Sequence, residues 1–236
     1  MKRFFVVGVI FIFAINLCFA MEVDGKEVKI IAHKGGKYWE GSNFLYVNDS
    51  ISLGADVIEL DVQHRLFRGY IVQHPFGFPG FDRDVFFPYQ GKLKDALKVI
   101  SNRAWVYLDV KDNSISPKRL IKFVRKYHNN TIIVGSFNWN YLRKFNGLDD
   151  DLIINLHTLP FVYAINNGKN IGADWINPYP FYLTEDYANK IQEEGFEFVP
   201  CGIENYTKLK QFIDWGAYAV SVYDIEKFKD SVNSTN

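Results

Sequence analysis

The chain has 236 residues, of which 48% are hydrophobic, and its 27 basic and 27 acidic side chains balance one another. This is the composition of a folded globular protein. The balanced charge argues against nucleic acid as a partner and against a polybasic membrane patch, because both need an excess of positive charge.

The first twenty residues, MKRFFVVGVIFIFAINLCFA, have the order of a secretory signal peptide: basic residues, an apolar run, then small residues. We expect cleavage after Ala20, a single domain over residues 21–236, and a secreted or periplasmic protein. An uncleaved membrane anchor is the alternative, because the apolar run is only slightly shorter than a bilayer span. After cleavage Cys201 is the one remaining cysteine, which excludes an internal disulfide.

Short runs rich in β-branched and aromatic residues alternate with segments of helical periodicity along the chain. Several helical segments, such as SPKRLIKFVRKYH, begin after a residue suited to capping. Eight strands separated by helices predict a (β/α)₈ TIM barrel, and a doubly wound open sheet is the alternative. The predicted strands are residues 28–33, 56–62, 104–110, 131–136, 151–157, 173–178, 196–201 and 217–222.

A ninth run, YIVQH at residues 70–74, follows the second strand too closely for a parallel crossover. It predicts a short antiparallel hairpin excursion after strand two. A turn at Leu66 and Phe67 would place His74 opposite Glu59.

Carboxylates gather at the ends of the second and third predicted strands. Glu59 and Asp61 are two residues apart and share one strand face, and Asp109 ends the next strand. Three carboxylates without clustered thiols suit a hard cation, so we expect one Mg²⁺ or Ca²⁺. The alternative for each acid taken alone is a solvated or salt-bridged side chain.

Two histidines are candidates for acid–base chemistry, because imidazole titrates near neutral pH. His33 ends the first strand, and His74 ends the ninth run. His64, His128 and His157 are assigned structural roles; for His157 a peripheral role at the site stays open.

The segment AHKGGK at residues 32–37 predicts an anion cradle of backbone N–H groups beside Lys34 and Lys37. Lys111, two residues after Asp109, either pairs with an acid or binds a phosphate oxygen.

The order of several motifs along the chain resembles that of the glycerophosphodiester phosphodiesterase family. These motifs are IAHKGG, Glu40, GADVIELDVQ, YIVQH, YLDVK, GSFNWNYL and WGAYAVSVYD. The resemblance covers nearly the whole chain after residue 20. It implies a TIM barrel with an excursion after strand two. The implied roles are acid–base catalysis for His33 and His74, metal binding for Glu59, Asp61 and Asp109, and substrate or phosphate binding for Lys34, Lys111 and Glu40.

The chain departs from the family pattern at several of these positions. Lys34 replaces an arginine, which exchanges a bidentate fork for a point charge. Asp109 replaces a glutamate that is one methylene longer. Glu40 lacks an adjacent asparagine, with Asn43 as a possible stand-in, and Pro75 follows His74 where an aspartate is usual.

The expected function is therefore a secreted, metal-dependent phosphodiesterase that hydrolyses a small glycerophosphodiester to glycerol phosphate and an alcohol. One alternative is a phospholipase C- or D-like enzyme that contacts membranes through the aromatic loop from Pro75 to Tyr89. The other is a non-catalytic, ligand-binding barrel.

Overall fold

The computed structural model describes residues 21–23, 25–36, 44–74, 89–158, 163–200 and 206–233. The predicted signal segment, Lys37, Glu40, Asn43, Cys201 and residues 75–88 of the aromatic loop lie outside the described residues. Among those described, no helix has the length and apolar character needed to cross a membrane.

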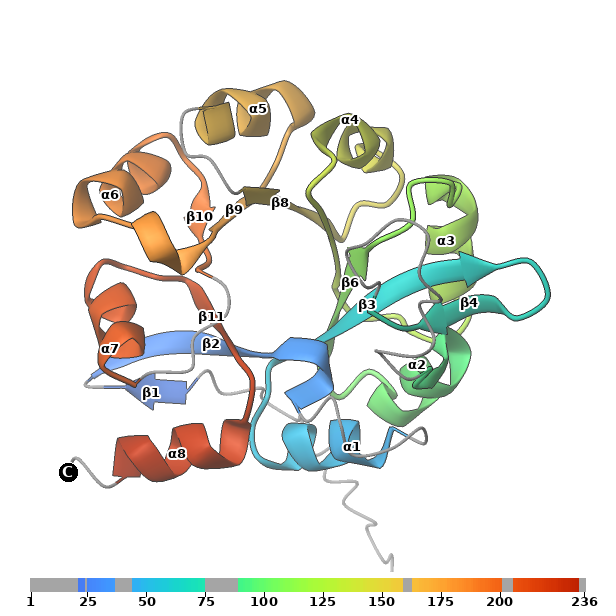
Figure 1. Ribbon diagram of the computed structural model, residues 1–236, viewed down its shortest axis with the longest axis horizontal. Helices are drawn as coiled ribbons and strands as arrows, with labels where there is room; N and C mark the ends of the chain where they lie inside the picture. The colour runs from blue at the N-terminus through green and yellow to red at the C-terminus, as the bar shows by residue number, and fades with distance from the viewer. Residues whose placement is uncertain are drawn as a thin grey trace, which may run out of the picture.

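Parallel strands form the wall of a barrel (Figure 1). Neighbouring strands pair in chain order, and β11 pairs in parallel with β2. The backbone N–H groups of Tyr218 and Ser221 donate to the carbonyls of Phe198 and Pro200, at 2.9 and 3.4 Å, and so join β11 to β10. The sheet therefore closes, which confirms the TIM barrel. The strands are β2 (Lys26–Ala32), β3 (Val57–Arg65), β6 (Trp105–Val110), β7 (Ile132–Ser136), β8 (Leu152–Thr158), β9 (Trp175–Pro178), β10 (Glu197–Phe198) and β11 (Ala219–Val222).

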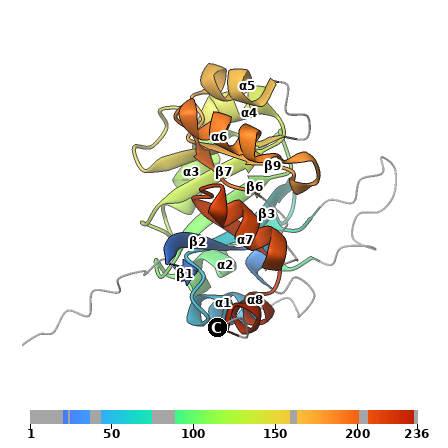
Figure 2. The same ribbon diagram turned by 90° about the vertical axis from the view of Figure 1, so that its left-hand side faces the viewer.

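Helices cover the outside of the barrel, as the side view in Figure 2 shows. In α3, Leu120, Ile121 and Val124 recur at helical spacing and are buried, and Pro117 occupies the first turn, where its missing N–H costs nothing. Burial of such faces forms the outer core. The helices are α1 (Leu45–Ser52), α2 (Leu93–Ile100), α3 (Pro117–Val124), α4 (Trp139–Leu142), α5 (Ala164–Ile171), α6 (Glu185–Glu193), α7 (Tyr206–Asp214) and α8 (Ile225–Asn233).

Shorter elements complete the described chain. Strand β1 (Met21–Val23) pairs antiparallel with β2. The 3₁₀ turns are η1 (His33–Gly36), η2 (Arg143–Phe145) and η4 (Pro180–Tyr182).

A second, smaller apolar cluster fills the inside of the barrel, and we call it the barrel floor. Side chains alternate between the two faces of a strand, so residues two or four positions after a floor residue also point inward. On β3 the residue Val57 belongs to the floor, and Glu59 and Asp61 continue the same face. The interior is thus apolar at one end and polar toward the carboxyl ends of the strands. The floor residues are Ile31, Val57, Tyr107, Ile133, Trp175, Val199 and Ala219.

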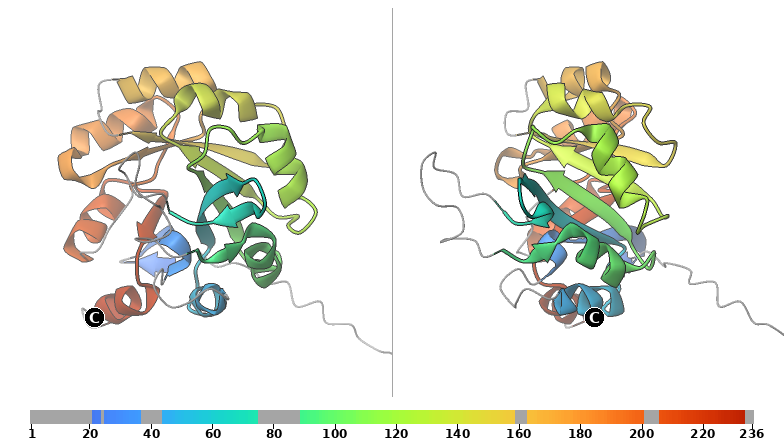
Figure 3. Two further views of the ribbon diagram at one scale, coloured as in Figure 1. Left: turned by 45° about the vertical axis from the view of Figure 1, so that its right-hand side comes forward. Right: turned by 90° about the vertical axis from the view of Figure 1, so that its right-hand side faces the viewer.

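Strand β3 continues beyond its pairing with β6 and turns back into β4 (Gly69–Val72), the predicted antiparallel excursion (Figure 3). Strand β4 also pairs with the short β5 (Gly91–Lys92).

The predicted register of this hairpin is wrong by one residue. Arg65 pairs with Gly69, and Val62 pairs with Val72. The turn therefore holds three residues, and Gly69, with φ +71°, supplies the left-handed conformation that closes it. His74 lies beyond the last pair rather than opposite Glu59, and His64 lies in the strand opposite Tyr70.

Candidate active site

A pocket of about 130 Å³ lies at the carboxyl ends of the strands, where a TIM barrel carries its functional groups. It brings together most of the site residues that the sequence predicts within the described part of the chain. Its lining consists of His33, Lys34, Glu59, His74, Tyr107, Asp109, Lys111, Phe137, His157, Asn177, Tyr179, Ser221 and Tyr223.

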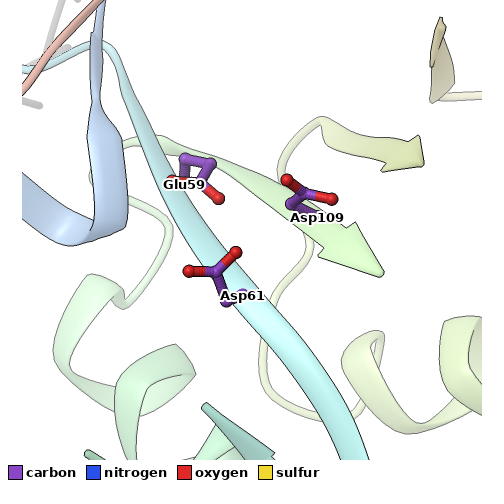
Figure 4. Close-up of side chains that lie close together, drawn as sticks. All are labelled: Glu59, Asp61 and Asp109. Atoms are coloured by element: carbon purple, nitrogen blue, oxygen red, sulfur yellow. The ribbon is translucent and has the colours of Figure 1, made fainter. Parts of the chain in front are cut away.

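Three buried carboxylates form a cluster beside this pocket (Figure 4). Glu59 and Asp61 come from β3, and Asp109 comes from β6, where it lies opposite Asp61 in the register. One oxygen of each lies within 4.8 Å of the other two. Like charges at this separation repel strongly in a buried site unless a cation or protons neutralise them.

Several carboxylate oxygens of the cluster are available as ligands for a cation. Glu59 Oε1, Asp61 Oδ2 and Asp109 Oδ1 accept no hydrogen bond from the described residues. Buried oxygens without a partner are costly, and a bound hard cation would satisfy them. The residues present therefore fit a divalent cation, with Glu59, Asp61 and Asp109 as its ligands.

Lys111 partly neutralises the cluster. Its Nζ lies 3.1 Å from Asp61 Oδ1 and 2.5 Å from Asp109 Oδ2. Burial opposes the charged ammonium, but the carboxylates of Asp109, Asp61 and Glu59 outweigh it and hold the pKa of Lys111 well above its ordinary value. Burial likewise opposes the Asp109 carboxylate, yet Lys111 and His157 hold the pKa of Asp109 below its usual range. One lysine leaves three carboxylates with excess negative charge.

The turn after β2 points two groups at one oxygen. His33 Nδ1 lies 3.1 Å from Glu59 Oε2, and the backbone N–H of Lys34 donates to the same oxygen at 2.5 Å. Gly35 is required here, because a β-carbon would lie 2.5 Å from the Tyr46 ring. The predicted cradle thus directs the Lys34 N–H to a carboxylate of the site.

His74 reaches the pocket from the end of the β4 segment. Burial lowers the pKa of His74 more than the nearby Asp61 carboxylate raises it, and the charges of Lys34 and Lys111 lower it further. Burial therefore favours the neutral imidazole, the form that accepts a proton.

Sequence reasoning missed a polar network that links β6 to β8. The Tyr107 hydroxyl hydrogen-bonds Nε2 of His157 and accepts a hydrogen bond of 2.6 Å from Asn155 Nδ2. His157 Nε2 also lies 3.7 Å from Asp109 Oδ2, and burial lowers the pKa of His157. His157 therefore belongs to the pocket wall, the role that the sequence left open.

No protein-family model matches the chain, and no curated protein matches its sequence. Solved structures do match it over nearly their whole lengths. An Oleispira antarctica phosphodiesterase in complex with the product sn-glycerol-3-phosphate is 13% identical with a TM-score of 0.70, covering 87% of this chain and 96% of its own. A glycerophosphodiester phosphodiesterase from Parabacteroides distasonis is 18% identical with a TM-score of 0.67, covering 88% and 98%.

A candidate glycerophosphodiester phosphodiesterase from Galdieria sulphuraria is 17% identical with a TM-score of 0.73, covering 90% of this chain and all of its own. At these identities the likeness is one of fold. The chain shares its fold with these phosphodiesterases.

Proposed function

We propose that the protein is a metal-dependent glycerophosphodiester phosphodiesterase that releases glycerol phosphate and an alcohol. The observation that carries this proposal is the cluster of Glu59, Asp61 and Asp109 in one site with His33 and His74. Two histidines beside an oxygen-rich cation site provide what cleavage of a phosphodiester needs: proton transfer and charge neutralisation.

The proposed roles follow from what each side chain touches. Glu59, Asp61 and Asp109 would hold a Mg²⁺ or Ca²⁺ ion, which supplies a positive charge for a phosphate oxygen. Glu59 Oε2 orients His33 through Nδ1 and so leaves Nε2 to exchange a proton with substrate.

Water, or first the glycerol hydroxyl of the substrate, attacks phosphorus while one histidine takes its proton and the other protonates the leaving alkoxide. In the second case water then opens the cyclic phosphate, so both routes end at glycerol phosphate. The Lys34 and Lys111 side chains line the same pocket and would stabilise charge on the phosphoryl group. The proposed substrate role of Glu40 concerns a residue outside the described part of the chain.

Purified protein incubated with glycerophosphodiesters tests this proposal. With Mg²⁺ or Ca²⁺ we expect release of glycerol phosphate, abolished by EDTA. His33→Asn and His74→Asn should each lower kcat at least ~100-fold, the usual contribution of a positioned acid or base. His64→Asn is the matched control, because His64 is exposed and lies on the hairpin away from the pocket.

The outcomes separate the alternatives. If wild type hydrolyses the diesters no faster than His33→Asn does, the non-catalytic barrel is the remaining alternative. Faster turnover of phospholipid vesicles than of soluble diesters would favour the phospholipase-like enzyme. Secretion is a separate proposal that rests on the sequence of residues 1–20, and sequencing the amino terminus of the exported protein would test it.

A further inference from the structure

A second hollow, of about 410 Å³, adjoins the acid cluster at the carboxyl ends of β6 and β7. We call it the β6–β7 hollow. It shares Asp109, Lys111 and Phe137 with the first pocket. Its remaining lining comes from Val110, Asn113, Ser136, Asn138 and Trp139.

The shape of a phosphodiester explains why two hollows meet at one charged junction. Its phosphorus carries two alcohol arms, so a site that holds the phosphate at Lys111 and the acids must accommodate one arm on each side. The first pocket contains both proposed catalytic histidines and is the smaller, at about 130 Å³ against 410 Å³. It therefore suits the glycerol arm, and the larger hollow suits the other arm.

We propose that the β6–β7 hollow binds the leaving alcohol of the substrate and selects an uncharged, polyhydroxylated ring. The inference rests on the proposed function and deepens it, because it assigns Asn113 and its neighbours to the choice of substrate.

Uncharged hydrogen-bonding groups make up one part of the lining. Asn113 presents an exposed amide. Asn138 uses Oδ1 to accept the Tyr141 N–H of α4 at 3.0 Å, which leaves its NH₂ group to donate. Hydroxyl groups of a ligand can donate to or accept from such amides.

Aromatic surface makes up the other part. Phe137 is 46% exposed, and Trp139 is partly buried against the outer core. An aromatic face beside amides suits the C–H face and the hydroxyl edge of a sugar-like ring.

The charges of the hollow argue against two other kinds of alcohol. Asp109 and Lys111 are its charged lining groups among the described residues, and they pair with each other. Lys111 and a divalent cation on the cluster would together balance the charges of Glu59, Asp61 and Asp109, so the hollow would offer a quaternary ammonium group no net negative charge. An acyl chain would have to cover the amides and the Ser136 hydroxyl, which is unfavourable without replacement hydrogen bonds.

Two substrates that differ only in this arm test the inference. Glycerophosphoinositol offers the hollow a polyhydroxylated ring, whereas the methyl arm of glycerophosphomethanol offers Asn113 no hydroxyl group. For Asn113→Ala we expect kcat/KM to fall roughly 5-fold with the inositol diester, mainly through KM, as for one lost hydrogen bond. With the methyl diester it should stay within about twofold of wild type.

Asn113→Trp, which places a large ring in the hollow, should lower kcat/KM with the inositol diester more than Asn113→Ala does and leave the methyl diester near wild type. Asn166→Ala is the matched control, because Asn166 is an exposed asparagine on α5 that lines neither hollow. Wild type should also prefer the inositol diester to glycerophosphocholine.

Equal losses of activity on both substrates, no loss on either, or a preference for the choline diester would each overturn the inference. In all three cases the proposed function stands, because the methyl diester is still hydrolysed. If wild type cleaves no diester, the proposed function fails and this inference fails with it.

Discussion

The hydroxyl of Tyr107 on β6 forms a hydrogen bond with Nε2 of His157 on β8, across strand β7, which lies between them. This pair can form because the intervening residue of β7 is Gly135. A β-carbon at that position would lie 2.7 Å from His157 Nε2 and also within clashing distance of the Tyr107 hydroxyl. The absence of a side chain at Gly135 therefore allows Tyr107 and His157 to approach each other.

Gly135→Ala should force Tyr107 and His157 apart. We expect a loss of about 2 kcal/mol in unfolding free energy, typical of overpacking, and at least a ~10-fold fall in phosphodiesterase activity. Urea unfolding and steady-state kinetics would measure the two effects. Gly195→Ala is the comparison without crowding, since no atom lies near its would-be β-carbon; its φ of +86° should cost stability but leave activity unchanged. Normal activity of Gly135→Ala would contradict the crowding argument.

Asp61→Asn should weaken cation binding without lowering the stability of the fold. Removing one of three clustered negative charges relieves repulsion, so in EDTA the variant should unfold at the same temperature as wild type or higher. Calorimetric titration should show Mg²⁺ or Ca²⁺ bound at least ~10-fold more weakly, because a charged ligand is lost.

Asp56→Asn is the matched control for Asp61→Asn. The Asp56 carboxylate is buried but accepts the Ile30 N–H at 2.8 Å outside the cluster. This change should cost about 1 to 2 kcal/mol of stability and leave cation affinity unchanged. The assignment of Asp61 would be wrong if both variants kept wild-type affinity.

Lys111→Met should destabilise the protein in EDTA, because Asp61 and Asp109 lose their cationic partner. Breaking a buried ion pair costs about 3 kcal/mol or more, which corresponds to roughly 10 °C in a protein of this size. Added Mg²⁺ or Ca²⁺ should raise the melting temperature of the variant more than that of wild type. Lys26→Met, which removes an exposed pair with Asp214, should change nothing measurable. Full stability of Lys111→Met in EDTA would refute this account.

Acid should weaken the fold through His128, which is fully buried and whose pKa burial lowers from 6.5 to about 4. Between these pH values the unfolded chain binds a proton that the folded chain does not, so stability falls as the pH falls. The loss approaches about 3 kcal/mol at pH 4.

Denaturant unfolding from pH 7 to 4 would measure this contribution as the difference between wild type and His128→Gln, whose stability should depend less on pH. The exposed His64→Gln should keep the wild-type dependence. Equal slopes for wild type and His128→Gln would show that His128 contributes nothing.

The fold was predictable because each barrel strand is a short apolar run and each intervening helix carries its own apolar face. The hairpin register was not, because it depends on the backbone of Gly69, which makes a three-residue turn from a segment that reads equally well as a two-residue turn.

The acids of the site were predictable because burying charged side chains within an apolar strand is unfavourable unless a cation or protons neutralise them. The sequence left a peripheral role open for His157 but gave none to Tyr107 and Asn155, because neutral polar side chains are common in strands and do not by themselves indicate a site. On β8, Ile153 packs against the barrel floor, so Asn155 and His157, two and four residues later, lie on the same inward face. The hydrogen bond from Asn155 to Tyr107 joins two strands that are not neighbours in the sequence, so only the structure shows it.

The barrel floor has one more consequence. Tyr107, Ile133 and Trp175 are at most 2% exposed and close the interior below the site. For the described residues, substrate and products of the proposed reaction therefore enter and leave at the carboxyl ends of the strands, where the pocket and the β6–β7 hollow lie. Glycerol phosphate that has not yet left occupies the route of the next diester, so it should inhibit competitively.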